Sequence, residues 1–169
     1  MGVMEWQGKA YKFGDDINTD YIISSRRKRD TLDPCALRRY IMEDIRPAFY
    51  SELSSAPSPI LVAGRNFGCG SAMEIAAQIL KASGIFVVIA ASFARSYYRN
   101  AVNNGILPLE TDTGKISEGD FLKVRYTEKN IDIVNTTTGL ETAIPGINGI
   151  VRDIFASGGI VAYFKNKTN

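Results

Sequence analysis

The pattern of apolar and polar positions predicts an opening strand, a central α/β unit and a β-rich final third. Loose alternation over residues 2–13 predicts the first strand, and the short apolar run 60–63 predicts a second. Helical spacing over 71–83 and 92–104 predicts two helices on either side of the β-branched run 85–90. A strand–helix–strand–helix unit of about 50 residues normally produces parallel strands.

The other segments predict shorter elements. Residues 21–23 predict a short strand, and Asp33-Pro34 predicts the start of a helix that runs to Ile45, with Asp33 as N-cap. Further strands are expected over 121–126, 131–136, 140–144 and 160–164, with a last helix over 149–156. The chain has no internal repeat or low-complexity tract, so residues 1–169 are expected to form a single domain.

Composition and charge argue against two classes of partner. Of the 169 residues, 45% are hydrophobic and 22% are charged, which is typical of a globular protein. The net charge of +2 is too small to indicate nucleic-acid binding. No apolar stretch is long enough to cross a bilayer, and the N-terminus lacks a signal-peptide pattern. We therefore expect a cytoplasmic protein without nucleic-acid or membrane partners.

The absence of histidine narrows the possible chemistry most. It removes the commonest general base, the usual zinc ligand and any histidine-dependent triad. The two cysteines, Cys35 and Cys69, are too few for an iron–sulfur cluster and lack the pattern of a disulfide framework. We expect no metal bound by this chain, so hydroxyls, carboxylates, lysine, arginine or a partner must supply the chemistry.

The most informative segment is the glycine-rich loop 64–71. Its glycines allow tight turning, and the helix that follows would direct free N–H groups at a phosphate or carboxylate. The spacing matches neither dinucleotide-binding nor P-loop motifs. Ser71 and Glu74 have the spacing of a capping box, which predicts that Ser71 caps the helix. A capping serine at this place can also be a reactive hydroxyl, since the helix dipole would stabilise its alkoxide.

Three segments in order resemble the signatures of isopropylmalate dehydratase small subunits: residues 14–23, residues 66–71, and residues 92–100 with 104–108. The resemblance implies an α/β fold, the three-layer β/β/α swivelling domain found as the fourth domain of aconitase. It implies a separate large subunit that carries a four-iron four-sulfur cluster. It also implies a malate-like 2-hydroxy dicarboxylic acid as substrate, with 3-isopropylmalate of leucine biosynthesis first and homoaconitate-, citramalate- or dimethylmalate-type acids as alternatives.

The resemblance also implies roles for individual residues. By motif position Ser71 is the base whose alkoxide removes a proton beside a carboxylate, while an iron of the partner's cluster takes the leaving hydroxyl. Asp20 matches an acid that orients groups of the active site, and Gly70 and Ala72 flank Ser71 in the substrate-binding loop.

The chain departs from the family pattern, which reads Gly-Ser-Ser-Arg-Glu-His, and two of the departures matter. Met73 replaces the arginine and Ile75 the histidine, and a thioether cannot replace a bidentate guanidinium. Either another arginine compensates, or the substrate is apolar there, or activity is lost. The candidates for compensation are Arg26, Arg27 and Arg29; alternatively, these residues form only a solvated basic loop.

The alternative function for the whole chain is that of a non-catalytic docking or regulatory partner of a large subunit. Isolated, the chain is a possible homo-oligomer.

Overall fold

Seven strands form one curled sheet in the computed structural model, which describes residues 4–127, 129–147 and 149–168. They are β1 (Met4–Lys12), β2 (Ile60–Ala63), β3 (Val87–Ala90), β4 (Leu107–Glu110), β5 (Phe121–Tyr126), β6 (Asn130–Asn135) and β7 (Leu140–Pro145). Their order across the sheet is β4-β3-β2-β1-β5-β6-β7. The first four strands are mutually parallel, and β5, β6 and β7 continue the sheet by antiparallel pairing.

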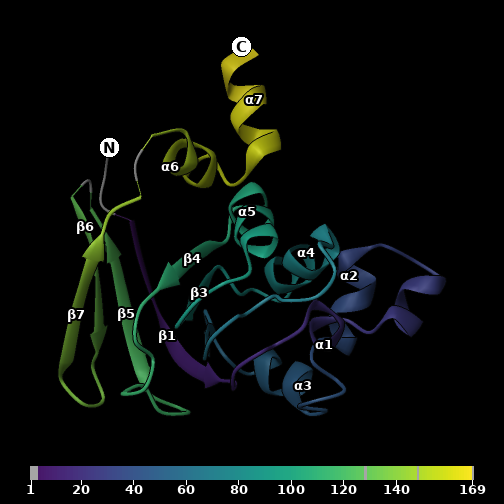
Figure 1. Cartoon of the computed structure of the whole chain (residues 1–169), viewed down its shortest axis with the longest axis horizontal. Helices are drawn as coiled ribbons and strands as arrows, with labels where there is room; N and C mark the ends of the chain where they lie inside the picture. The colour runs from purple at the N-terminus through teal and green to yellow at the C-terminus, as the bar shows by residue number, and fades with distance from the viewer. Residues whose placement is uncertain (1–3, 128, 148, 169) are drawn as a thin grey trace.

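The first strand, β1, joins the two halves of the sheet. Its residues Met4 to Lys9 pair with β5, and Ala10 to Lys12 pair with β2. Because one long strand serves both halves, the antiparallel strands stand to one side of the parallel ones in Figure 1.

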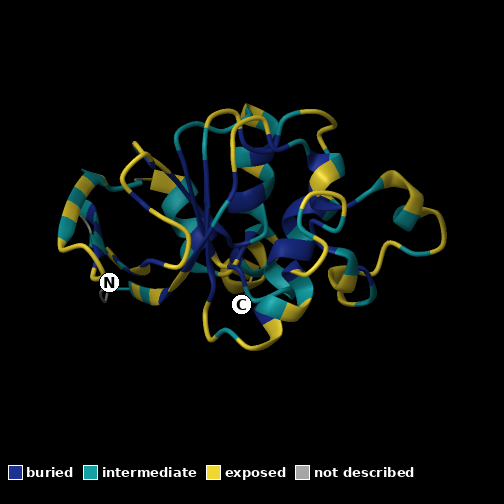
Figure 2. Ribbon diagram, turned by 90° about the horizontal axis from the view of Figure 1, so that it is seen from below, coloured by how far each residue is buried: buried dark blue, intermediate teal, exposed yellow. Residues whose placement is uncertain are grey.

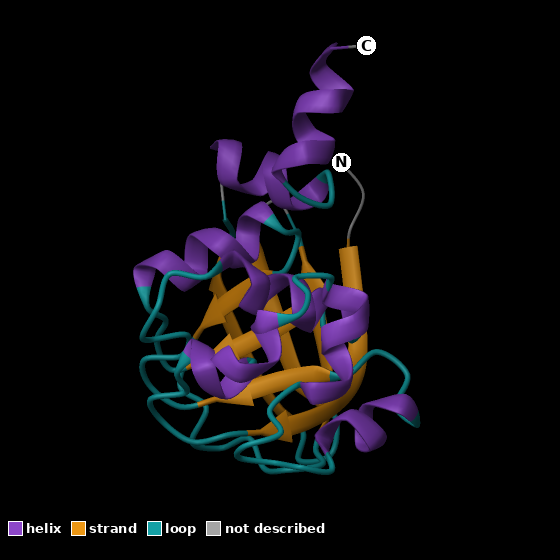
Figure 3. Cartoon of the chain, turned by 90° about the vertical axis from the view of Figure 1, so that its right-hand side faces the viewer, coloured by secondary structure: helices purple, strands orange, loops and turns teal. Residues whose placement is uncertain are grey.

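Helices lie in front of the strands in the view of Figure 3. The α-helices are α1 (Thr19–Ile22), α2 (Pro34–Leu37), α3 (Phe49–Ser54), α4 (Glu74–Ala82), α5 (Arg95–Asn103), α6 (Gly149–Ala156) and α7 (Ile160–Thr168). Two 3₁₀ helices, η1 (Ser25–Arg29) and η2 (Arg38–Tyr40), lie among them. Helix α7 extends away from the rest of the chain in Figures 1 and 3. No described helix is long and apolar enough to cross a membrane.

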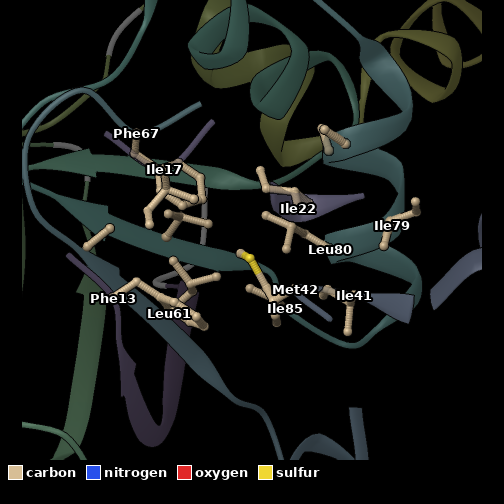
Figure 4. Packing of buried hydrophobic residues seen from close by; sticks show 14 of the residues in the cluster. Phe13, Ile17, Ile22, Ile41, Met42, Leu61, Phe67, Ile79, Leu80 and Ile85 are labelled. Atoms are coloured by element: carbon tan, nitrogen blue, oxygen red, sulfur yellow. The ribbon is translucent and has the colours of Figure 1, made fainter. Parts of the chain in front are cut away.

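Buried strand residues alternate between two hydrophobic cores. On β2, Leu61 faces the core shared with the helices, whereas Val62 faces the core shared with the antiparallel strands. Figure 4 shows the first core, where Leu61 lies beside Phe13, and Leu80 of α4 lies beside Ile22 of α1. Both faces of the parallel strands are covered, which explains their continuous apolar runs and their dark blue colour at the centre of Figure 2. The three layers confirm the predicted β/β/α arrangement.

The structure confirms the predicted parallel α/β unit and the three antiparallel strands of the final third. Strand β4 and helix α3 were not predicted. The helix predicted to begin at Asp33 does begin there, since the Asp33 side chain accepts a hydrogen bond from the Cys35 N–H at 3.0 Å. It ends after one turn, however, and η2 follows. The chain turns away at Met42, which has a φ of 55° and donates its N–H to the Ile22 carbonyl at 3.0 Å, burying Met42 against α1.

Two predicted strands are helices. Residues 21–23 fall in and after α1, because the Asn18 side chain accepts a hydrogen bond from the Asp20 N–H and starts a helical turn. Residues 160–164 begin α7, since Gly158 and Gly159, both with positive φ, end α6 and let a second helix start at once. In both places a short apolar run fits a strand and a buried helical face equally well.

Candidate functional site

Three loops meet at the carboxyl ends of the parallel strands. The loop after β1 contacts the loop after β2 through four backbone hydrogen bonds, among them Gly68 N–H to the Ile17 carbonyl at 2.8 Å and Thr19 N–H to the Cys69 carbonyl at 2.9 Å. The loop after β3 joins them, since Phe67 donates its N–H to the Ser92 carbonyl at 3.0 Å. The three signature-like segments are thus neighbours in space, at the sheet edge where open α/β sheets bind ligands.

Side chains fix the first two loops to each other. Asp15 accepts hydrogen bonds from the backbone and the guanidinium of Arg65, and these lower the pKa of its carboxyl. Asp16 accepts a hydrogen bond from the Asn66 amide at 2.8 Å. A Cβ added to Gly70 would lie 2.4 Å from the Asn18 Oδ1, and the φ of Gly70 is +89°. This close approach of backbone to side chain is available only to glycine.

Ser71 lies on the open side of this junction. Its residue is exposed, and its hydroxyl has no hydrogen-bond partner among the described residues. Its carbonyl is held on two sides, by the Thr19 hydroxyl at 2.9 Å and by the Met73 N–H at 2.8 Å. The backbone of Ser71 is therefore fixed while its hydroxyl stays available.

The predicted capping box is wrong. Helix α4 begins at Glu74 with Met73 as N-cap, so Ser71 lies outside the helix. Glu74 does not reach back to the serine, since its carboxylate accepts a hydrogen bond from the Asn104 amide at 3.1 Å. With Ser71 held by Thr19 and Met73, the N-cap of the helix lies two residues later than the capping-box spacing suggested.

Asp20 and the basic segment after it lie beside this loop. Asp20 Oδ1 accepts hydrogen bonds from the Ser25 hydroxyl at 2.8 Å and from the Lys28 ammonium at 3.4 Å. Lys28 Nζ also lies 3.0 Å from the Met73 sulfur. Sequence reasoning passed over Lys28 for its arginine neighbours, although it belongs to the same run of four cations.

The three candidate arginines lie in different surroundings. Arg26 forms an ion pair with Asp44 at 2.5 Å, and Arg27 forms one with Glu43 at 2.8 Å. Arg27 also lies over the Tyr40 ring, at 3.9 Å from its centroid. These contacts raise the pKa of both arginines. Arg29 is exposed and forms no ion pair within the described part of the chain.

Gly70 and Ala72, the two neighbours of Ser71, are both exposed. Cys69 is partly buried, and burial, with a smaller contribution from the charge of Asp16, raises the pKa of its thiol. The described residues contain no group of three potential metal ligands among Cys, Asp and Glu. What the site offers is a free hydroxyl, a carboxylate, a nearby ammonium and exposed loop backbone. These groups suit an anionic substrate and a proton transfer, on a surface open to a second molecule.

The fold and this loop junction define an α/β domain of the aconitase type. Residues 41–114 match the family model described as the aconitase C-terminal domain. The chain is 40% identical over 161 residues to the methanogen homoaconitase small subunit of Methanocaldococcus jannaschii, covering 95% of this chain and 92% of the relative. It is 43% identical to the 3-isopropylmalate dehydratase small subunit 1 of Archaeoglobus fulgidus, covering 94% and 96%.

A solved structure agrees with these relatives. The crystal structure of a 3-isopropylmalate dehydratase from Methanocaldococcus jannaschii superposes with a TM-score of 0.88 at 38% identity, covering 98% of this chain and 96% of that one. The chain belongs to the isopropylmalate dehydratase and homoaconitase small-subunit family. The resemblance stated from the sequence is confirmed.

Proposed function

We propose that this chain is the small subunit of a heteromeric hydro-lyase that dehydrates or isomerises a 2-hydroxy dicarboxylic acid, with 3-isopropylmalate as the first candidate. The observation that carries the proposal is the free hydroxyl of Ser71 at the junction of three loops. The names of relatives on both sides of the family, 3-isopropylmalate dehydratase and homoaconitase small subunits, support this class of substrate.

In this proposal Ser71 is the base. Its alkoxide removes a proton from the carbon beside a substrate carboxylate, and the hydroxyl on the neighbouring carbon departs. One C–H bond and one C–O bond break, a carbon–carbon double bond forms, and the proton is held on Ser71 Oγ. Asp20 orients the segment that carries the cations, and the exposed backbone of Gly70 and Ala72 contacts the substrate.

Among the three arginines, Arg29 is the most available to a substrate carboxylate. Arg26 and Arg27 would first have to leave the carboxylates of Asp44 and Glu43. Arg29 has no such bond to give up within the described residues, so it is the first of the three to test by mutation.

The iron–sulfur cluster belongs to the expected large subunit, because two cysteines on separate segments cannot hold it here. Bound there, it would supply a Lewis acid for the departing hydroxyl. The proposal includes a cytoplasmic location and residues 1–169 acting as one swivelling domain. The exposed edge around Ser71 would be closed by the large subunit during turnover, and homo-oligomers would form only when that partner is absent.

A second candidate is a docking or regulatory partner without turnover. Met73 favours it, because it stands where the family has arginine. The two readings differ in what they predict for Ser71, since a docking partner has no need of that hydroxyl.

The test is turnover by the complex with the large subunit, prepared without oxygen and followed by the absorbance of the unsaturated product. Wild type is compared with Ser71→Ala and with the control Ser54→Ala. Ser54 is an exposed serine at the end of α3, and it lines a hollow beside Ala82 and Gly84, at the far end of α4 from Ser71.

We expect Ser71→Ala to reduce kcat by at least about 10²-fold, the usual contribution of a positioned base, with Ser54→Ala unchanged. A complex that forms but shows no turnover of 3-isopropylmalate or of the homoaconitate-, citramalate- and dimethylmalate-type acids would favour the docking reading. Undiminished turnover by Ser71→Ala would show that Ser71 is not the base.

A further inference from the structure

We infer that Lys28 binds a carboxylate of the substrate, beside Met73 and above the Ser71 loop. This inference rests on the proposed function and assigns a specificity-determining residue to it. Lys28 belongs to η1, a short 3₁₀ helix, and its ammonium reaches both Asp20 and Met73.

Three of the four cations of η1 have ion-pair partners among the described residues, and they face two different sides. Arg26 and Arg27 turn toward Glu43 and Asp44, where each forms a hydrogen-bonded ion pair. Lys28 turns the opposite way, toward the loop junction, and its side chain is only 10% exposed. A lysine is rarely buried to this extent unless its charge has a function or a strong partner.

The partners of Lys28 leave its ammonium undersatisfied. An ammonium has three N–H donors and no acceptor. Asp20 lies at 3.4 Å, a long contact for a charged hydrogen bond, and its own side chain is 48% exposed and also accepts from Ser25. The second partner, the Met73 sulfur at 3.0 Å, is a weak acceptor. A nearly buried cation with such partners gains substantially from an incoming carboxylate.

The position of the ammonium relative to Ser71 is the third argument. Met73, which contacts Lys28 through its sulfur, donates its N–H to the Ser71 carbonyl at 2.8 Å. Asp20 follows Thr19, whose hydroxyl donates to the same carbonyl. Met73 and the residue that precedes Asp20 are thus both hydrogen-bonded to the residue that carries the proposed base. A carboxylate on Lys28 would therefore lie close to the substrate carbon from which Ser71 removes the proton.

The same contact explains how methionine can stand at position 73. A guanidinium there would compete with the Lys28 ammonium for one small region, with two like charges side by side. Lys28 would thus supply from η1 the single positive charge that the family's arginine would supply from position 73, just before α4. The arrangement predicts that the two positions can exchange roles.

The test uses the complex with the large subunit and five variants: Lys28→Met, Lys28→Arg, Met73→Arg, the double variant Lys28→Met/Met73→Arg, and the control Lys115→Met. Lys115 is an exposed lysine with no hydrogen bond or ion pair to other described residues. Initial rates with 3-isopropylmalate give kcat and KM separately, and thermal unfolding of each complex reports on folding.

We expect Lys28→Met to lower kcat/KM by about 10- to 100-fold, mostly through a higher KM, as for the loss of one charge-assisted hydrogen bond. Lys28→Arg should keep part of the affinity, and the double variant should regain at least about tenfold over Lys28→Met. Met73→Arg alone should impair binding through like-charge repulsion. Lys115→Met should match wild type.

Three results would overturn the inference. One is a Lys28→Met complex whose kcat/KM stays within about twofold of an active wild type. Another is a loss of activity in Lys28→Met that accompanies a lower melting temperature with KM unchanged. The third is a double variant no better than Lys28→Met, which would assign Lys28 to a purely structural ion pair with Asp20.

An inactive wild-type complex would count against the proposed function. The role of Lys28 would then need a measurement that does not depend on turnover. In that case the readout is binding, measured as the rise in melting temperature that 3-isopropylmalate gives. A rise in wild type that is lost in Lys28→Met and regained in the double variant supports the carboxylate contact. No rise in wild type, or an equal rise in Lys28→Met, overturns it.

Discussion

A comparison of Gly68→Ala with Gly84→Ala tests how closely the backbone of the glycine loop is packed. Gly68 lies in this loop, whereas Gly84 follows α4. Both glycines have nearly the same positive φ, +79° at Gly68 and +82° at Gly84. They differ in their surroundings. A Cβ at Gly84 would meet nothing within 4 Å, whereas one at Gly68 would lie 2.1 Å from Cγ of Tyr97. The pair therefore separates the cost of backbone conformation from the cost of the clash.

The magnitudes follow from these surroundings. Alanine in the left-handed region costs about 1 kcal/mol, which is the whole effect expected at Gly84. At Gly68 the Tyr97 ring would have to retreat by about 1.3 Å, the difference between an ordinary contact at 3.4 Å and the 2.1 Å found. The ring is 1% exposed and packs edge-on against Phe67 at 5.0 Å, so it has little room to move. Overpacking of this kind adds about 3 kcal/mol, giving about 4 kcal/mol in total.

Urea unfolding followed by circular dichroism measures both free energies, with thermal unfolding as a second readout. At roughly 3 °C per kcal/mol for a chain of this length, we expect melting temperatures lower by about 3 °C for Gly84→Ala and about 12 °C for Gly68→Ala. Equal losses of unfolding free energy in the two variants, with an unchanged near-ultraviolet spectrum in Gly68→Ala, would refute the steric argument.

Three further predictions concern single side chains. Asn18→Ala removes the cap of α1 and should lower the free energy of unfolding by about 1 kcal/mol in urea titrations. Tyr97→Phe should leave stability unchanged or raise it slightly, since the buried hydroxyl has no partner among the described residues and burial raises its pKa. Partial loss of water around the Glu118 carboxylate raises its pKa, but hydrogen bonds from Arg46 and the Lys12 N–H lower the pKa overall. Because the pKa is lowered in the folded state, ionised Glu118 stabilises the fold above about pH 4, and this stabilisation is lost as the pH falls below that value. Glu118→Gln should therefore lower the free energy of unfolding at pH 7 and lower it much less near pH 3.

Local patterns in the sequence were sufficient for much of the fold. The continuous apolar runs of β2 and β3 and the helical spacing between them determine a parallel α/β unit, because only strands covered on both faces tolerate such runs. The lack of histidine and the presence of only two cysteines by themselves limit the chemistry that this chain can perform. The motif segments were enough to place the family, which the relatives confirm.

Short segments were beyond local reasoning, because their conformation depends on distant partners. Ile22 and Ile23 fit a strand by residue type, yet Asn18 caps a helical turn there and its backbone pairs with Cys69, about fifty positions away. Likewise Ser71 and Glu74 have capping-box spacing, but each accepts a hydrogen bond from a distant residue instead. The Ser71 carbonyl accepts from Thr19 and the Glu74 carboxylate accepts from Asn104. Where a tertiary hydrogen bond competes with a local one, spacing along the chain cannot show which forms.

The basic run shows most clearly what sequence determined and what tertiary structure decided. The sequence establishes that four cations, Arg26 to Arg29, follow Asp20 closely, and the family resemblance implies that this segment lies near the glycine loop. Only the fold brings Glu43 and Asp44 to Arg26 and Arg27, and so directs Lys28 to Met73. Charges adjacent in sequence take opposite directions because a 3₁₀ turn spreads side chains around its axis and each ion pair depends on where the chain returns.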